Sequence, residues 1–351
     1  MKRLAALGAS ALAAAGLLVG GLAAGCGSSN VPATTAPRSA ERPKMQVLAQ
    51  IDLPFEDVRS QELSGIAWDD STRTLYAISD HVPIIVPLHA GDDLRSWTFG
   101  DPIPVSISDN WDGEGIALLP DGFLIANETG GHIYELDRTG RTRRALDLPP
   151  QYGTALKNKS LEALSLSPDG RFLFTANESA LEDDGSQPTA LHGTTVRILR
   201  IDRATSKSVE FAYRTEPVFA DGGGDMGVAE ICALSDTDLL VLERSYVPGV
   251  GNSIRIFRTS IANALDVKDL EHFTDTTPVI PKQLVMDLAL AGLEVSPARS
   301  LTTMALYPNY EGMTLGPRML DGRRVLFLIS DDNGKPTQVT RLLVLAASGL
   351  P

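Results

Sequence analysis

The stretch EGIALLPDGFLIANE, residues 114–128, decides the fold of this chain. Two apolar runs flank Pro120-Asp121-Gly122, and Asp-Gly between apolar runs is a strong signal for a tight turn between strands. The stretch therefore predicts a β-hairpin. Both runs are almost continuously apolar, which is typical of strands buried on both faces. The hairpin also has an acidic residue at each end, Glu114 and Glu128.

The same pattern occurs five times along the chain. A Glu precedes a short apolar strand, a turn follows, and a second strand ends in an acidic residue; the other copies are residues 62–80, 162–178, 230–243 and 311–331. Two further strands follow most copies, for example 132–136 and 143–148 after Glu128. Four antiparallel strands in each of several repeated units predict an all-β fold, a β-propeller.

The number of blades follows from the two ends of the domain, which we place at residues 46–351. The last unit has a third strand, 340–345, and its fourth can come from residues 47–53. Such closure removes an exposed sheet edge, and it predicts five blades. Two alternatives stay open here. Residues 260–309 could contain the hairpin of a sixth blade, and a β-sandwich could carry acidic strand ends by chance.

Acidic residues are predicted to meet on one face of the propeller. In an antiparallel hairpin the start of the first strand and the end of the second lie at the same edge. The loops at this edge are also the long ones, 109–113, 149–160, 179–192, 220–229 and the run before Glu311. The acids expected there, with Asp112 and Asp332 beside them, are Glu62, Asp80, Glu114, Glu128, Glu162, Glu178, Glu230, Glu243, Glu311 and Asp331.

Crowded carboxylates repel one another unless cations or hydrogen-bond donors relieve the charge. Hard cations do so, and Ca²⁺ accepts six to eight oxygen ligands in flexible geometry. The twelve acids are therefore candidate metal ligands, with Ca²⁺ as the expected ion. The alternative is structural: roughly half of the ten ring acids are expected to bond backbone amides or pair with Arg.

The N-terminus predicts export. Lys2 and Arg3 precede an uncharged segment rich in Ala, Leu and Gly, and small residues lead to Cys26. Residues 1–25 therefore indicate a secretory signal, and Cys26 is the expected site of lipidation. Residues 26–45 are rich in Ser, Thr, Pro and Ala and predict a disordered tether. The expected location is the cell envelope, anchored to the membrane by the lipid. Cleavage near Ala24 that leaves Cys26 free is the alternative.

The composition limits the classes of molecule that this chain is expected to bind. The formal net charge is −13, and loss of Lys2 and Arg3 with the signal makes it more negative. A chain with this negative charge is not expected to bind nucleic acid. Apart from Cys26 there is only Cys232, in an apolar run, where a buried thiol is expected. We expect a monomer that binds a small substrate.

These motifs resemble those of the phytase-like family of bacterial secreted proteins, also described as esterase-like phytase. The resemblance rests on residues 62–68 (ELSGIAW), 112–117 (DGEGIA), 242–244 (LER), 311–317 (EGMTLGP) and 330–333 (SDDN). It spans most of residues 46–346. It implies a propeller and suggests the hydrolysis of phosphoric esters. Propeller phytases proper have six blades, which keeps that count open.

The chemistry that fits is metal-assisted hydrolysis. No Gly-x-Ser-x-Gly elbow is present, and the His residues, 81, 89, 132, 192 and 272, lack the spacing of zinc ligands. Glu114 and Glu311 are the candidate catalytic acids. Lys159 and Arg244 are the candidate phosphate partners because both lie beside motif acids, although either can be a plain salt-bridge residue. A non-catalytic binding or scaffold propeller is the competing function, since a fold alone does not determine activity.

Overall fold

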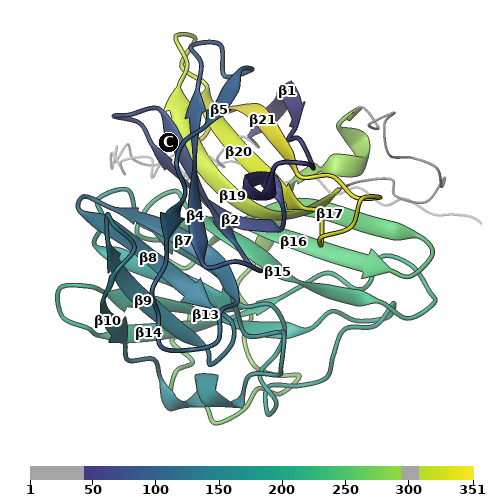
Figure 1. Ribbon diagram of the computed structural model, residues 1–351. Helices are drawn as coiled ribbons and strands as arrows, with labels where there is room; N and C mark the ends of the chain where they lie inside the picture. Colours follow the sequence, from purple (N-terminus) through teal and green to yellow (C-terminus); the bar gives the residue numbers. More distant parts are fainter. Residues whose placement is uncertain (1–42, 294–307) are drawn as a thin grey trace, which may run out of the picture. The chain divides into compact units, whose positions relative to one another are not determined.

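Five antiparallel β-sheets form the fold, in a computed structural model that describes residues 43–293 and 308–351 (Figure 1). Contacts divide the chain into Met1–Ala40 and Glu41–Pro351, and the fold is that of the second unit. The predicted all-β propeller with five blades is confirmed. The predicted signal, Cys26 and most of the tether lie outside the described residues.

The blades follow the chain. Blade 1 contains β2 (Leu63–Asp69), β3 (Thr74–Ser79), β4 (Ile84–Ala90) and β5 (Trp97–Phe99), with β6 (Ile103–Pro104) also paired to β4. Blade 2 contains β7 (Gly113–Leu119), β8 (Gly122–Asn127), β9 (His132–Asp137) and β10 (Thr142–Leu146). Blade 3 contains β11 (Leu161–Leu166), β12 (Phe172–Asn177), β13 (Thr195–Asp202) and β14 (Ser208–Arg214).

Blade 4 contains β15 (Asp225–Ala233), β16 (Asp238–Val247), β17 (Gly251–Ser260) and β18 (Lys282–Asp287). Blade 5 contains β19 (Asn309–Arg318), β20 (Arg324–Asp331), β21 (Arg341–Ser348) and β1 (Lys44–Asp52). The loops of the described residues contain three short 3-10 helices: η1 (Val58–Ser60), η2 (Pro150–Thr154) and η3 (Leu288–Leu290). No helix in the described ranges is long and apolar enough to cross a membrane.

Closure joins the two ends of the domain. Strand β1 pairs antiparallel with β21, from Lys44 opposite Ser348 to Asp52 opposite Arg341. A bulge between Val47 and Ala49 shifts the register. The residues before and after the bulge therefore point to opposite faces of β1 and pack against the two neighbouring blades. Met45 and Val47 pack between blades 4 and 5, while Ala49 and Ile51 pack between blades 5 and 1. The predicted closure is therefore confirmed.

The alternative of a sixth blade rested on residues 260–309. In the described part of this stretch the chain forms β18, which pairs with β17 and completes blade 4. The residues that seemed long enough for a new hairpin thus supply the outer strand of an existing blade. Blade 1 also contains β4 and β5, which the repeated pattern did not include; β4 is largely buried, whereas β5 has three residues and is partly exposed.

The core lies between neighbouring blades. Five apolar clusters fill the five junctions; that between blades 1 and 2, for example, contains Ile78, Ile116 and Phe123. Each sheet therefore buries both faces, which explains the continuous apolar strands. Cys232 is buried and free, as predicted, and burial raises the pKa of its thiol to about 12.

The innermost strands of the five blades are β2, β7, β11, β15 and β19. Each contacts the next around the centre, and β19 contacts β2 and so closes the ring. This ring of strands positions the acidic residues.

Candidate functional site

The acids of the inner strands lie inside the strands, at irregular points. Glu114, Glu162 and Glu311 occupy a register shift in β7, β11 and β19, and Glu230 follows the one in β15. A bulge redirects a side chain and bends its strand. The sequence placed each Glu before its strand. The structure instead uses the bulge to direct these carboxylates.

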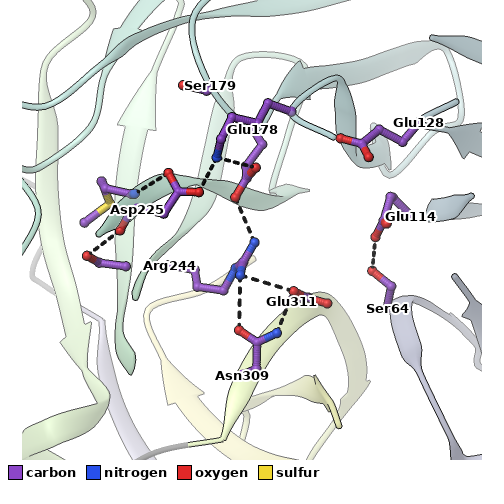
Figure 2. Close-up of polar contacts among 12 residues, drawn as sticks. Ser64, Glu114, Glu128, Glu178, Ser179, Asp225, Arg244, Asn309 and Glu311 are labelled. Atoms are coloured by element: carbon purple, nitrogen blue, oxygen red, sulfur yellow. Dashed lines mark hydrogen bonds and ion pairs between the residues drawn. The ribbon is translucent and has the colours of Figure 1, made fainter. Parts of the chain in front are cut away.

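Blade 1 departs from the predicted pattern. Its register shift falls between Leu63 and Ile66, so Ser64 takes the position that Glu114 occupies in blade 2. The Ser64 hydroxyl donates to Glu114 Oε2 over 2.6 Å (Figure 2). Glu62, the predicted ring acid, precedes β2 in the left-handed region with φ 51°. Its backbone N–H donates to Asp332 Oδ1 over 3.2 Å, so Glu62 and Asp332 join blade 1 to the last loop of blade 5.

Glycines bring the inner strands close together beside these acids. A Cβ on Gly65 would lie 2.3 Å from the Glu114 carbonyl oxygen, and one on Gly115 would lie 2.7 Å from that of Glu162. Both distances are shorter than van der Waals contact with a backbone. Glycine within the register shift, directly after Ser64 or Glu114, therefore allows neighbouring blades to approach at the centre, and it draws their carboxylates together.

The carboxylates are near enough to repel one another. Burial first, and then Glu311 and Asp80, raise the pKa of Glu114 well above its usual range. Burial together with Glu311 and Glu62 raises the pKa of Asp80 to about 8. The pKa of Glu162 and of Asp331 is raised well above normal by burial and neighbouring acids. Blades 1, 2, 3 and 5 thus contribute to one acidic cluster.

Three of these acids converge closely. Asp112, Glu114 and Glu128 each offer one oxygen, and these oxygens lie within 4.8 Å of one another. Ser160 donates its backbone N–H to Glu128 Oε1 over 2.8 Å, while the Thr129 hydroxyl donates to Asp112 Oδ2 over 3.1 Å. Burial raises the pKa of Glu128 to about 7 and also raises that of Asp112.

Two cations lie beside the acids. Figure 2 shows Arg244 between Glu178 and Glu311, at 2.8 Å from Glu178 Oε1 and 3.5 Å from Glu311 Oε1. Lys159 pairs with the other oxygen of Glu178 and with Asp225. Burial disfavours the charge on Arg244, but Glu311 and Glu178 outweigh it and raise the pKa of the guanidinium. The four candidate catalytic residues therefore lie in one region: Arg244 contacts Glu311, and Lys159 shares Glu178 with Arg244. Glu114 is close enough to Glu311 for the two carboxylates to repel each other. The catalytic roles of these residues stay predictions.

The donor set fits a hard divalent cation. Carboxylate oxygens are the ligands that Ca²⁺ and Mg²⁺ prefer, and Asp112, Glu114 and Glu128 supply them. Asp80 Oδ1 is buried with no hydrogen-bond partner among the described residues, and so is Arg244 Nε. Buried polar atoms normally have partners. Orphaned acceptors and donors beside a carboxylate triplet are therefore consistent with a site that takes a cation and an anionic group.

Glu243 was predicted in the ring, but its side chain lies elsewhere. Strand β16 continues through Glu243 to Val247, and successive side chains of a strand point to opposite faces. Arg244 therefore reaches the ring, while Glu243 accepts from Tyr213 Oη and Lys282 Nζ, each over 2.6 Å. Its role in this position is structural.

Glu230 is a second acid held by the fold. Its Oε1 accepts the backbone N–H groups of Leu164 and Ile231, both over 2.9 Å, and so it joins blades 3 and 4. The expectation that about half of the ring acids have structural partners is met. Acids that accept from a backbone amide or pair with a cation are Glu128, Glu178, Glu230, Glu243, Glu311 and Asp331.

Sequence reasoning missed four contributors: Ser64, Asn127, Asp225 and Asn309. Asn309 Nδ2 donates to Glu311 Oε1 over 2.8 Å. Asn127 accepts the backbone N–H of Asp112 over 2.9 Å and so fixes the loop that carries this acid. One signal was available for Ser64, because Ser64-Gly-Ile-Ala67 aligns with Glu114-Gly-Ile-Ala117. Asp225 was placed in a loop, 220–229, whose second half belongs to β15.

Comparison with known families identifies the chain. The Phytase-like family, described as esterase-like activity of phytase, matches residues 58–334. The chain belongs to this family. The matched range includes all five inner strands and every acid of the cluster, so the predicted resemblance is confirmed. No curated protein matches the sequence of this phytase-like protein.

Solved structures with similar folds are distant in sequence. They include an endo-arabinase from Bacteroides thetaiotaomicron, 13% identical over 85% of this chain and 96% of that one, with a TM-score of 0.47. A chain of a nidogen/laminin complex is 12% identical over 87% and 98%, with a TM-score of 0.44. A luciferin-regenerating enzyme is 14% identical over 88% and 96%, with a TM-score of 0.40. No activity is transferred from them.

Proposed function

We propose that the acidic end of this phytase-like propeller binds a divalent cation, Ca²⁺ in preference to Mg²⁺, and hydrolyses phosphoric esters. The observation that supports it most is the convergence of Asp112, Glu114 and Glu128, with oxygens within 4.8 Å of one another. Mg²⁺ demands a tighter octahedron and gives up water reluctantly, whereas Ca²⁺ accepts more oxygens in looser geometry. When bound, the ion would polarise the ester and lower the pKa of a water molecule.

The residues of the chain have separate tasks in this proposal. Arg244 and Lys159 bind phosphoryl oxygens, since Arg forms bidentate contacts with phosphate and Lys supplies a compact charge. Both cations are held in place by Glu178, at 2.8 Å from Arg244 and 3.2 Å from Lys159. Glu311, oriented by Asn309 Nδ2, accepts a proton from the attacking water. Neighbouring acids supply the remaining oxygen ligands.

A non-catalytic binding propeller is the second candidate. The observation that favours it is the pairing of both cations, because Arg244 contacts Glu178 and Glu311, and Lys159 contacts Glu178 and Asp225. In that case the ion pairs hold the channel rigid, and the loops above it bind a partner.

Phosphate release distinguishes these functions. The purified protein is incubated with a panel of phosphomonoesters in Ca²⁺, in Mg²⁺ and in chelator. We expect release of inorganic phosphate that depends on Ca²⁺ and is reduced at least tenfold by chelator. An Arg244→Lys variant, which keeps the charge but loses the bidentate fork, should raise KM more than it lowers kcat. Calcium binding without release from any ester would favour the binding propeller.

The location is a proposal as well. We propose that the protein is exported and anchored to the membrane through a lipid on Cys26, because an uncharged segment ends in small residues at that cysteine. Several acyl chains anchor a protein firmly, whereas one does so only marginally. Cys26→Ser should therefore move the protein from the detergent phase to the aqueous phase. Cys232→Ser is the matched control and should not change the partition. Equal partition of wild type and Cys26→Ser would contradict the anchor.

A further inference from the structure

A large cavity lies at the other end of the inner strands. Its volume is about 900 Å³, within the range of about 300–1,000 Å³ usual for small-molecule sites. In β7, β11, β15 and β19 its lining begins two residues after the acid of each strand, and the first such residues are Ile116, Leu164, Cys232 and Met313. The acidic cluster and this cavity therefore occupy opposite ends of the same five strands, and nothing in the proposed hydrolysis uses the cavity.

Most of the residues that line this cavity are apolar, although polar and apolar atoms contribute about equally to its exposed surface. Leu118, Leu166, Leu315 and Trp68 line it and are only partly buried, although they lie on inner strands whose other apolar residues are fully covered. Such a surface favours the burial of an apolar group, at roughly 25 cal/mol per Å² removed from water.

Two arginines lie in the lining on neighbouring strands. Arg318 ends β19, Arg324 begins β20, and the two are directly opposite in the register. Like charges at opposite positions destabilise a sheet pair. Neither side chain forms an ion pair among the described residues; Asp70 attracts the Arg324 guanidinium only from beyond ion-pair distance, and the Arg324 Nε is buried without a hydrogen-bond partner there. In a chain with formal net charge −13, two adjacent arginines that form no ion pair indicate a site for an anion.

The acids in the same lining have other contacts. Asp169 Oδ1 accepts the Ser167 hydroxyl over 2.6 Å and the Arg171 backbone N–H over 3.0 Å, which closes a turn. Asp236 faces Arg200, whose guanidinium also donates to the Asp236 carbonyl oxygen over 3.1 Å. Apart from the more distant Asp70, no acid compensates the charge of Arg318 and Arg324, which is therefore available to a ligand.

We propose that this cavity binds an amphiphile with an apolar tail and one anionic head group, a carboxylate or a phosphate. The tail lies along Leu118, Leu166 and Leu315, and the head group pairs with Arg318 and Arg324. This assignment is independent of the hydrolysis at the acidic end. It gives the propeller two sites with opposite chemistry, one for cations and one for an apolar anion.

Isothermal titration tests the proposal with four probes of one chain length, each below its micellar concentration: decanoate, decyl phosphate, decanol and decyltrimethylammonium. We expect an anionic probe to bind at least tenfold more tightly than decanol, and the cationic probe not to bind. Comparison of the two anions shows which head group is preferred. Fluorescence of Trp68, which lines the cavity, should change on binding, and Trp68→Phe should remove that change.

Charge variants complete the test. Arg318→Gln with Arg324→Gln should reduce anion binding to the level of decanol. Arg323→Gln is the control, because Arg323 is paired with Asp321 at 2.7 Å and is not in the lining. Without ligand, the double variant should melt at or above the wild-type temperature, since a like-charge pair is removed. Absence of binding by both anions, equal binding of decanol, or undiminished binding by the double variant would overturn the proposal.

Discussion

Calcium is expected to raise the melting temperature of this phytase-like protein by roughly 5–10 °C, and a Glu114→Gln, Glu311→Gln double variant is expected to lose that shift. A ligand that binds only the folded state at 100 times its Kd stabilises by about 2.7 kcal/mol. In a large domain about 1 kcal/mol corresponds to roughly 2–4 °C. Mg²⁺ should give a smaller shift. The double variant should also lose any Ca²⁺-dependent phosphate release.

The control for this prediction is Glu243→Gln. Glu243 belongs to the same sequence pattern, but it contacts Tyr213 and Lys282 away from the ring. Its substitution should lower the free energy of unfolding by about 1.5–3 kcal/mol, the usual contribution of hydrogen bonds to a charged group, and leave the calcium shift intact. In chelator the double variant should melt close to wild type, because glutamine keeps an acceptor for Ser64. If neither calcium nor chelator changes the melting temperature, and titration detects no binding at millimolar Ca²⁺, the metal site is refuted.

Deletion of residues 44–53 is expected to abolish cooperative folding of the propeller. The deletion removes β1 and exposes β21, seven of whose eight residues are buried, as a long apolar edge that invites aggregation. It also removes Asp52, the ion-pair partner of Arg341, whose side chain is 4% exposed. Because the Asp52 side chain is 35% exposed, the loss of this ion pair adds less than that of a fully buried pair, and the unpaired edge of β21 is the main cause of the expected effect. Circular dichroism on heating and the soluble fraction measure the effect.

An equal deletion of residues 30–39 controls for chain length, because it falls in the predicted tether and should leave the melting temperature unchanged. A synthetic peptide of residues 43–54 should restore folding to the variant that lacks 44–53, since a free strand can add to an open sheet edge. A scrambled peptide should not. Identical melting of the two deletions would show that closure by β1 contributes nothing to the stability of the domain.

The sequence predicted most of the acids of the candidate site, but not which of their side chains share it. The acids at the ends of β8, β12 and β20 follow from antiparallel pairing, and Glu128, Glu178 and Asp331 lie where the pattern places them. Glu243 matches the pattern equally well and lies elsewhere, because β16 does not end there. Ser64 was overlooked because the pattern of acidic ends aligns blade 1 on Glu62, whereas the motifs Ser64-Gly-Ile-Ala67 and Glu114-Gly-Ile-Ala117 align two residues later.

The sequence by itself determined the all-β class, the five repeated hairpins and the closure by residues 47–53. These features depend on local turn chemistry, on runs that are apolar on both faces, and on a last unit that lacks a strand. Only the tertiary structure decided which acids share a site. That choice depends on bulges, on the approach of Gly65 and Gly115 to neighbouring strands, and on the face to which each side chain points. Carboxylates from separate blades become neighbours only when the ring of blades closes. The distance between two such carboxylates therefore cannot be predicted from their separation along the sequence.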